Sequence, residues 1–166
     1  LKEWAVSPEG WSYQKRSVNG SVRVASGFNL SSLDAEESYQ EHYHTVFFKE
    51  RTTAEKGLDA RLIVTFSLKY RDYLRDIRDR KIKRASKMIE SGSYATESDR
   101  SPKSLIKKIY KTKQGEQADR KEAALNTEKI KNDEALDGFY AVTTNLFKEE
   151  MPVDKVATIS ARRWEI

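Results

Sequence analysis

The segment Arg61-Leu62-Ile63-Val64-Thr65-Phe66 leads directly into Ser67-Leu68-Lys69-Tyr70, where the hydrophobic pattern changes from that of a strand to that of a helix. The first part is β-branched and aromatic, which favours a strand that pairs with the similar segment Thr45-Val46-Phe47-Phe48. From about residue 67 to residue 91, apolar side chains recur at helical spacing, and Gly92 supplies a C-terminal stop. The sequence therefore predicts an α+β fold.

The chain before this junction is predicted to form irregular β structure, because residues 1–33 hold only short apolar pieces such as Trp4-Ala5-Val6. Asn19-Gly20 lies between Ser17-Val18 and Ser21-Val22, a pattern typical of a two-residue hairpin turn. After the helix, residues 92–102 are small and polar, which predicts a loop.

The C-terminal half holds four more signals. Residues 103–125 suit either a short helix or two strands, with Gln114-Gly115-Glu116 as the turn of a hairpin in the second case. Asn126 is an N-cap candidate for a helix over roughly 127–135. Residues 138–144 are predicted to form a largely buried strand, and Pro152 to lie in the first turn of a helix that runs to the end of the chain.

Composition limits the class of protein. The 166 residues are 37% hydrophobic, enough for one ordinary domain. The 31 Lys and Arg residues outnumber the 26 Asp and Glu residues, so a net charge of +5 permits a nucleic-acid partner without requiring one. Because cysteine is absent, disulfides, thiolate metal sites and a cysteine nucleophile are excluded, as is typical of a reducing cytoplasm. No apolar run approaches the roughly 20 residues that span a bilayer, so we expect a soluble protein with no membrane partner.

The motifs of several common enzyme classes are absent from the sequence. The chain contains no P-loop, no dinucleotide-binding glycine motif and no nucleophile elbow. His42 and His44 flank Tyr43 and would share one face of a strand, as metal ligands can, but spacing fixes no third ligand. No metal site is therefore assigned within this chain.

The end of the chain carries a more specific pattern. It consists of Asp137-Gly138-Phe139-Tyr140-Ala141-Val142-Thr143-Thr144-Asn145-Leu146, then Pro152, and finally Arg163-Trp164-Glu165-Ile166. This pattern resembles the insertion-sequence-four superfamily of DDE transposases, in which a strand ending in Thr precedes a helix that carries the third catalytic acid. Residues 64–70, residues 75–78 and residues 125–130 also resemble the branch with a long insertion before that helix. The resemblance covers about residues 45–166.

The resemblance implies how the chain is organised. Residues 1–136 would be the insertion domain, built of short strands and helices. Residues 137–166 would be one strand and the beginning of one helix of a split RNase H-like catalytic domain. Leu1 and the interrupted apolar pattern at Ile166 suggest that both ends are cut from a longer bacterial, cytoplasmic protein.

The resemblance also implies the chemistry of the parent protein. It would cleave and join insertion-sequence ends by two-metal phosphoryl transfer, with Mg²⁺ held by three carboxylates. Two of these would lie upstream of Leu1 and the third directly after Ile166, so the fragment itself would be inactive and bind no metal. Glu165 does not replace the missing acid, because two residues correspond to about 200° of helical rotation.

The fragment would then bind the DNA of the transposon ends, in a parent that could act as a homodimer. Aligning the Thr of the family strand with Thr144 places at Tyr140 the aromatic residue that stacks on a flipped base. Arg163 matches a DNA-contacting Arg of the family, whereas the family's Tyr in this helix falls on Ser160. The alternatives are that Tyr140 packs inside a buried strand and that Arg163 is an ordinary surface residue.

Two basic segments offer further contacts with nucleic acid. Arg71, Arg75 and Arg78 lie on one flank of the predicted helix and could follow a phosphate backbone. A solvated face with ordinary intrahelical ion pairs is the favoured interpretation of such a helix. Lysines at 103, 107, 108, 111 and 113 form a second basic stretch, either a DNA-contacting arm or a solubilising loop. A stand-alone basic nucleic-acid-binding module is therefore the alternative function, and a structural or interaction domain is a third.

Overall fold

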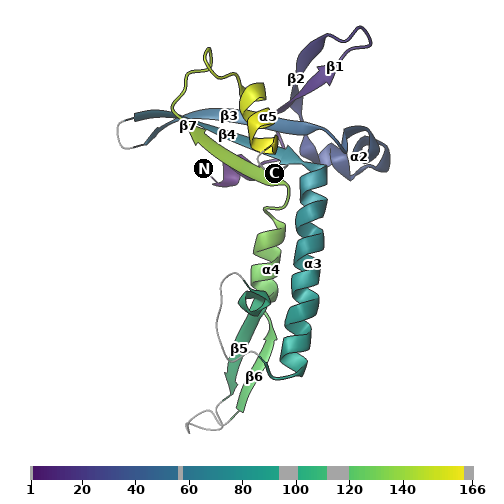
Figure 1. Ribbon diagram of the computed structural model, residues 1–166, viewed down its shortest axis with the longest axis vertical. Helices are drawn as coiled ribbons and strands as arrows, with labels where there is room; N and C mark the ends of the chain where they lie inside the picture. Colours follow the sequence, from purple (N-terminus) through teal and green to yellow (C-terminus); the bar gives the residue numbers. More distant parts are fainter. Residues whose placement is uncertain (1, 56–57, 94–100, 112–119, 163–166) are drawn as a thin grey trace. The chain divides into compact units, whose positions relative to one another are not determined.

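The computed structural model describes residues 2–55, 58–93, 101–111 and 120–162 (Figure 1). The chain divides into two compact units. Unit 1 combines Leu1–Asp72 with Gly138–Ile166, and unit 2 is Tyr73–Asp137. The fold is α+β, with a five-stranded antiparallel sheet in unit 1, a two-stranded sheet in unit 2 and several helices. This confirms the predicted fold class.

The five-stranded sheet has the order β2-β1-β3-β4-β7. Its strands are β1 (Trp11–Arg16), β2 (Val22–Phe28), β3 (Val46–Glu55), β4 (Leu58–Ser67) and β7 (Phe139–Thr144). The predicted pairing of the two apolar segments is confirmed, because Phe47 of β3 lies opposite Phe66 of β4. The late strand β7 pairs with the other edge of β4, so residues 137–166 contribute to the same sheet as residues 11–67.

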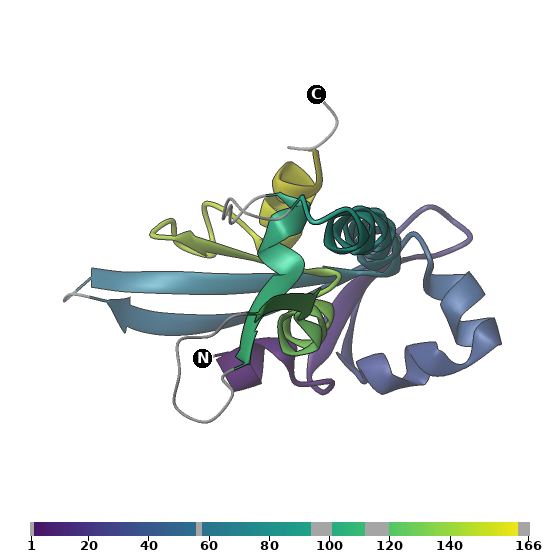
Figure 2. The same ribbon diagram turned by 90° about the horizontal axis from the view of Figure 1, so that it is seen from below.

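Each face of the sheet has its own hydrophobic cluster. On one face the aromatic residues Trp11, Phe47 and Phe66 pack together, joined by side chains of α1 (Lys2–Val6), η1 (Leu30–Asp34) and α2 (Glu36–His42). On the other face Phe48 and Ile63 lie under α5 (Val153–Arg162). Figure 2 shows α5 on one side of β3 and β4 and α1 on the other. Burying a large apolar side chain contributes roughly 1.5–3 kcal/mol, so both faces stabilise the sheet.

The β1–β2 hairpin confirms the predicted turn but not its length. Ser17 donates its N–H to the carbonyl of Ser21, and Gly20 donates to the carbonyl of Ser17. These bonds leave a three-residue loop, residues 18–20, instead of a two-residue turn, and Gly20 closes it with a φ of 81°. The expectation of irregular β structure was wrong for Trp4-Ala5-Val6, which lie in the helix α1.

The predicted long helix is confirmed as α3 (Leu68–Glu90). It ends as expected at Gly92, whose φ is 70°. Ser93 donates to the carbonyl of Met88 and Gly92 to that of Ile89, which is the bonding pattern of a Schellman motif.

Unit 2 resolves the two options for residues 103–125. After the 3-10 turn η2 (Pro102–Leu105), strands β5 (Ile106–Lys111) and β6 (Arg120–Leu125) form an antiparallel hairpin. The predicted turn residues 114–116 lie outside the described residues. Helix α4 (Thr127–Glu134) begins as predicted, because Oδ1 of Asn126 accepts a hydrogen bond from the N–H of Lys129.

The last predicted strand and helix exist, with two corrections. Strand β7 is half-exposed rather than largely buried, because it forms an edge of the sheet and Ala141 and Thr143 face solvent. Pro152 directly precedes α5 instead of lying within its first turn, and residues 163–166 lie outside the described residues. Among the described helices, none is long and apolar enough to cross a membrane.

Candidate nucleic-acid interface

Tyr140 lies on the edge strand β7, opposite Thr65 of β4. It is half-buried and belongs to neither hydrophobic cluster, although its neighbour Phe139 joins the first cluster and Val142 the second. Within the described part of the chain its phenol has no hydrogen-bond partner. Tyr140 is therefore partly accessible at the edge of the sheet.

The strand that carries Tyr140 ends at Thr144. The Oγ1 atom of Thr144 accepts a hydrogen bond from the N–H of Leu146 at 3.1 Å, which turns the chain out of the sheet. The resemblance expected a strand that ends in this threonine, and the observed boundary agrees with that expectation.

The three arginines of α3 have different surroundings. Arg78 is buried, and its guanidinium donates to Asp137 at 2.7 Å. Arg75 keeps 52% of its side chain exposed, and its Nε atom lies 3.9 Å from Asp137. Arg71 is largely covered, with its guanidinium 5.6 Å from the centre of the Tyr39 ring and its Nε atom 3.6 Å from Asp72. Arg75 is thus the most accessible of the three, whereas Arg163 lies outside the described residues.

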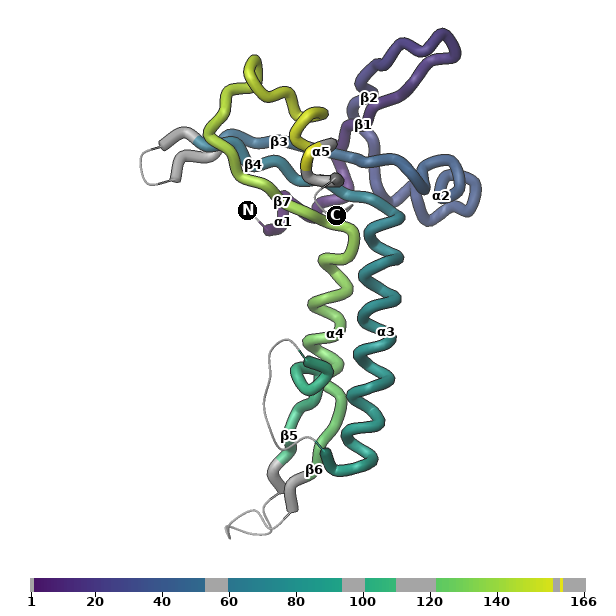
Figure 3. The backbone as a smooth tube through the Cα atoms, in the orientation of Figure 1, coloured from purple at the N-terminus to yellow at the C-terminus, as the bar shows by residue number. Residues whose placement is uncertain are grey.

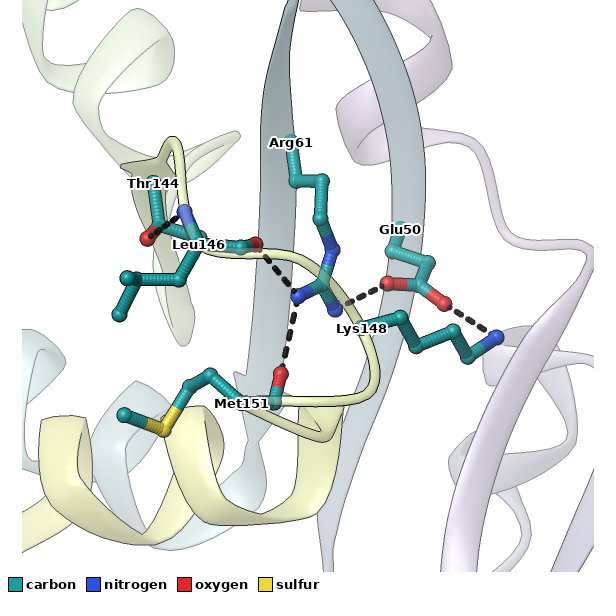
Figure 4. A network of polar contacts seen from close by, with 6 residues as sticks. All are labelled: Glu50, Arg61, Thr144, Leu146, Lys148 and Met151. Carbon is teal, nitrogen blue, oxygen red and sulfur yellow. Dashed lines mark hydrogen bonds and ion pairs between the residues drawn. The ribbon is translucent and has the colours of Figure 1, made fainter.

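A network around Arg61 was not predicted from the sequence (Figure 4). Arg61 donates to the carbonyl oxygens of Leu146 at 3.0 Å and Met151 at 2.9 Å, and to Glu50 at 2.7 Å. Lys148 lies 2.8 Å from the other carboxylate oxygen of Glu50. Burial alone would raise the pKa of Glu50, but the hydrogen bonds from Lys148 and Arg61 outweigh it and hold this pKa below its usual value.

This network fixes the loop between β7 and α5. A pocket of about 400 Å³ lies beside it, lined in part by Arg61, Lys148 and Phe147. Because the guanidinium of Arg61 already donates to two carbonyls and a carboxylate, its role is to stabilise the loop and not to bind a ligand. Phe147 is 67% exposed on the same loop.

Lys49 was also missed. It is only 6% exposed, and its Nζ atom lies 4.4 Å from the centre of the Trp11 ring and 5.1 Å from that of Trp4. It donates to the carbonyl and the hydroxyl of Ser7. Burial lowers the pKa of Lys49. One sequence signal could have identified this role: Lys49 follows the inward-facing Phe47 by two residues, and such residues lie on the same face of a strand.

The histidine pair does not have the geometry that a shared metal ligand needs. His42 ends α2 and is buried against the rings of Tyr13 and Phe28, with centroids 5.1 Å away in both cases. His44 is exposed in the turn that follows, so the two do not share a strand face. The condition that both histidines lie on a strand is not met, because α2 continues through His42 and β3 begins only at Val46.

In the basic stretch that begins at residue 103, Lys107, Lys108 and Lys111 lie on β5. Neither a loose arm nor a loop therefore describes residues 106–111, and Lys113 lies outside the described residues. Across residues 2–55, 58–93, 101–111 and 120–162, no group of three or more His, Asp or Glu side chains could hold a metal ion. The Mg²⁺ that the resemblance implies would be held by carboxylates of the parent protein outside this chain, and no catalytic step is assigned to the described residues.

Comparison with known proteins adds no relative. No protein-family model matches the chain, and no curated protein and no solved structure is significantly similar to it.

Proposed function

We propose that this chain is a fragment of a DDE transposase of the insertion-sequence-four superfamily, from the branch with a long insertion, and that it binds the DNA of the transposon ends. The observation that carries the proposal is Tyr140, a half-buried aromatic residue on an edge strand that joins neither hydrophobic cluster. A flat ring on an accessible edge suits stacking on an unpaired base, which is worth about 1–3 kcal/mol per base.

In this proposal residues 1–136 are the insertion domain and residues 137–166 return the chain to the split RNase H-like catalytic domain. Strand β7 also completes the sheet of unit 1, so it would tie the returning segment to the insertion domain. The parent would supply the carboxylates and Mg²⁺ for phosphoryl transfer from outside this chain, and it could act as a homodimer. The role of this chain is to hold the DNA end.

The cations divide between two roles. Arg75 has the most exposed guanidinium of Arg71, Arg75 and Arg78, and it is proposed to contact a phosphate, as is Arg163. Arg71 and Arg78 are held by Asp72 and Asp137, so we assign their main contribution to the fold. Exposed arginines raise affinity without selecting a sequence, because phosphate contacts carry no base information.

The test measures binding of the 166-residue chain to two duplexes of one sequence, one fully paired and one with a single extrahelical 2-aminopurine. Tyr140→Ala is expected to weaken binding to the extrahelical-base duplex by about 5-fold to 150-fold, which corresponds to about 1–3 kcal/mol. Tyr140→Phe is expected to bind normally, because stacking needs only the ring. Tyr73→Ala, at a tyrosine that is 57% exposed on α3, is the matched control.

The readouts separate the proposal from general adhesion to DNA. Stacking quenches 2-aminopurine fluorescence in the wild type and in Tyr140→Phe, but not in Tyr140→Ala. Equal affinity of Tyr140→Ala and the wild type for the extrahelical-base duplex would refute the stacking role. Absence of any DNA binding by the wild-type chain would refute the proposed function altogether.

A further inference from the structure

The β1–β2 hairpin is the most one-sided basic segment in the first half of the chain. No acidic residue occurs from Gly10 to Leu33, although the whole chain contains 26. Three cations, Lys15, Arg16 and Arg23, fall within this stretch, and all three are exposed. In the described part of the chain, no carboxylate lies within ion-pair distance of them, so their charge is directed to solvent.

The distal half of the hairpin is an unsupported two-stranded ribbon. Only Ser12 and Tyr13 of β1 pair with β3, so from Gln14 onward the ribbon has no third strand (Figure 3). Every residue from Gln14 to Arg16 is exposed, as is every residue from Val22 to Val24. Val18, at the tip, is fully exposed. Both faces of the ribbon are therefore open to a partner.

One face of the ribbon carries an unfavourable pair. Lys15 lies directly opposite Arg23 in the register. Like charges at directly opposed positions destabilise an antiparallel pair, and no neighbouring carboxylate relieves this one in the described residues. A like-charge pair that nothing in the fold relieves is typical of a binding surface, because an anionic ligand would remove the repulsion.

The other face combines polar and apolar side chains. Gln14 lies opposite Val24, and Arg16 lies opposite Val22. Alternation along β1 puts Gln14 and Arg16 on the same face as Ser12, and the register continues from Ser12 through Phe48 and Thr65 to Tyr140. This face of the ribbon and Tyr140 therefore belong to the same face of one sheet.

We infer that the distal β1–β2 ribbon is a second contact with duplex DNA and inserts into the major groove. This inference rests on the proposed function, but it assigns a different surface from that of Tyr140. The major groove, about 12 Å wide and 8.5 Å deep, admits a two-stranded ribbon. Three residue pairs at about 3.3 Å per residue extend the ribbon by roughly 10 Å before the turn, which matches this depth.

The side chains suit the two parts of a groove. Lys15 and Arg23 face phosphates, which relieve their mutual repulsion. Gln14 and Arg16 can form hydrogen bonds with base edges, while Val22 and Val24 offer apolar contact to thymine methyl groups. A second copy of this ribbon is a poorer partner, because it would bring the same cations together.

The test compares the 166-residue chain with Lys15→Gln/Arg23→Gln in titrations of a fully paired duplex at several salt concentrations. The matched control is Lys131→Gln/Lys155→Gln, which removes the same charge from two exposed lysines of α4 and α5. Each phosphate contact contributes about 0.9 to the slope of log K against log salt. The ribbon variant is therefore expected to reduce the slope by about 2 and the affinity at low salt by at least about tenfold, whereas the control changes both less.

A structural role for the two cations predicts a different result. Thermal unfolding of the ribbon variant is expected at the wild-type temperature or above it, because the change removes a repulsion. A lower unfolding temperature together with weaker binding would overturn the inference, as would equal slopes for the ribbon and control variants while the wild type still binds. The latter result leaves the proposed function intact.

A competitor completes the test. Poly-glutamate is expected to compete poorly, since it offers no major groove. If poly-glutamate displaces the duplex at equal charge, the ribbon is a general polyanion or acidic-protein site and the groove inference fails. A ribbon variant that loses duplex binding, together with a Tyr140→Ala variant that still quenches 2-aminopurine fluorescence as the wild type does, would support the groove contact of the ribbon. The same pair of results would refute the stacking role of Tyr140.

Discussion

Arg78 of α3 and Asp137, 59 residues later, form a bidentate ion pair within unit 2. The Nη1 atom of Arg78 donates to Oδ1 of Asp137 at 2.7 Å, and its Nη2 atom lies 2.6 Å from Oδ2. Both side chains are at most 10% exposed. The hydrogen bond to Asp137 raises the pKa of Arg78, so the guanidinium keeps its charge.

Asp137→Ala is expected to lower the free energy of unfolding by about 3–5 kcal/mol, because it leaves the guanidinium of Arg78 buried without its partner. Urea titration followed by far-ultraviolet circular dichroism measures this loss. Asp76→Ala is the matched control, since Asp76 pairs with Arg80 on the surface with 66% of its side chain exposed, and such pairs contribute at most about 1 kcal/mol. Equal losses for the two variants would show that the buried pair has no special role.

Gly138→Ala is expected to destabilise the protein for two reasons. Gly138 has φ of 84°, and a Cβ there would lie 2.8 Å from Phe66 and 2.9 Å from Cβ of Arg71. Gly20→Ala separates the reasons, because Gly20 has φ of 81° and a Cβ would meet nothing within 4 Å. Gly20→Ala is expected to cost about 1–2 kcal/mol from backbone strain alone, and Gly138→Ala clearly more. Thermal unfolding that ranks the two variants the other way would contradict the close packing at Gly138.

Glu50→Gln is expected to change the acid stability of unit 1. The pKa of Glu50 is held below the ordinary value of 4.5 in the folded chain, so its ion pairs contribute stability above that pH. This contribution is lost as the pH falls through the lowered folded pKa, because the unfolded chain then binds the proton more readily. Wild type is therefore expected to unfold at a higher temperature than Glu50→Gln at pH 7, and this difference is expected to disappear as the pH is lowered. Glu149→Gln, at an exposed neighbour on the same loop, is the control.

Lys49→Met is expected to remove a pH dependence at the alkaline end. Burial lowers the pKa of Lys49 from 10.5, so between the lowered value and 10.5 the unfolded chain binds more protons than the folded one. Stability of the wild type should therefore rise with pH across this window relative to Lys49→Met. Parallel stability curves for the two proteins in urea would mean that Lys49 is solvated as an ordinary surface lysine. Lys69→Met, at an exposed lysine, is the control.

Local signals predicted most of the elements. Arg61 to Phe66, the helix that follows and the Asn126 cap were found because strand propensity, helical spacing and capping act over a few residues. The buried partners were not found. Arg61 bonds to carbonyls 85 and 90 residues away, and Arg78 to a carboxylate 59 residues away, so no short pattern could identify either role.

Exposure was equally hard to infer for particular side chains. Residues 138–144 are apolar enough for a buried strand, yet β7 forms an edge, because no further strand pairs with it in the described residues. Which strand becomes an edge depends on sheet order, and sheet order depends on pairings between distant segments. Lys49 illustrates the converse, since a lysine in a strand is usually solvated, but here its Nζ atom lies over the indole rings of Trp4 and Trp11.

The position of β7 in the chain sets an order of events in folding. Strands β1 to β4 are joined by neighbouring stretches of sequence and can pair early, whereas β7 reaches β4 only after residues 68–137 have been synthesised. The N–H of Ser67 donates to the carbonyl of Gly138, so the two ends of the segment 68–137 are joined by a hydrogen bond. Bringing the ends of a flexible segment together costs entropy that grows with the logarithm of its length. Early formation of α3 and α4 shortens the flexible part of this segment. Docking of β7 is therefore expected to be a late step, and on the ribosome it cannot precede emergence of the C-terminal segment.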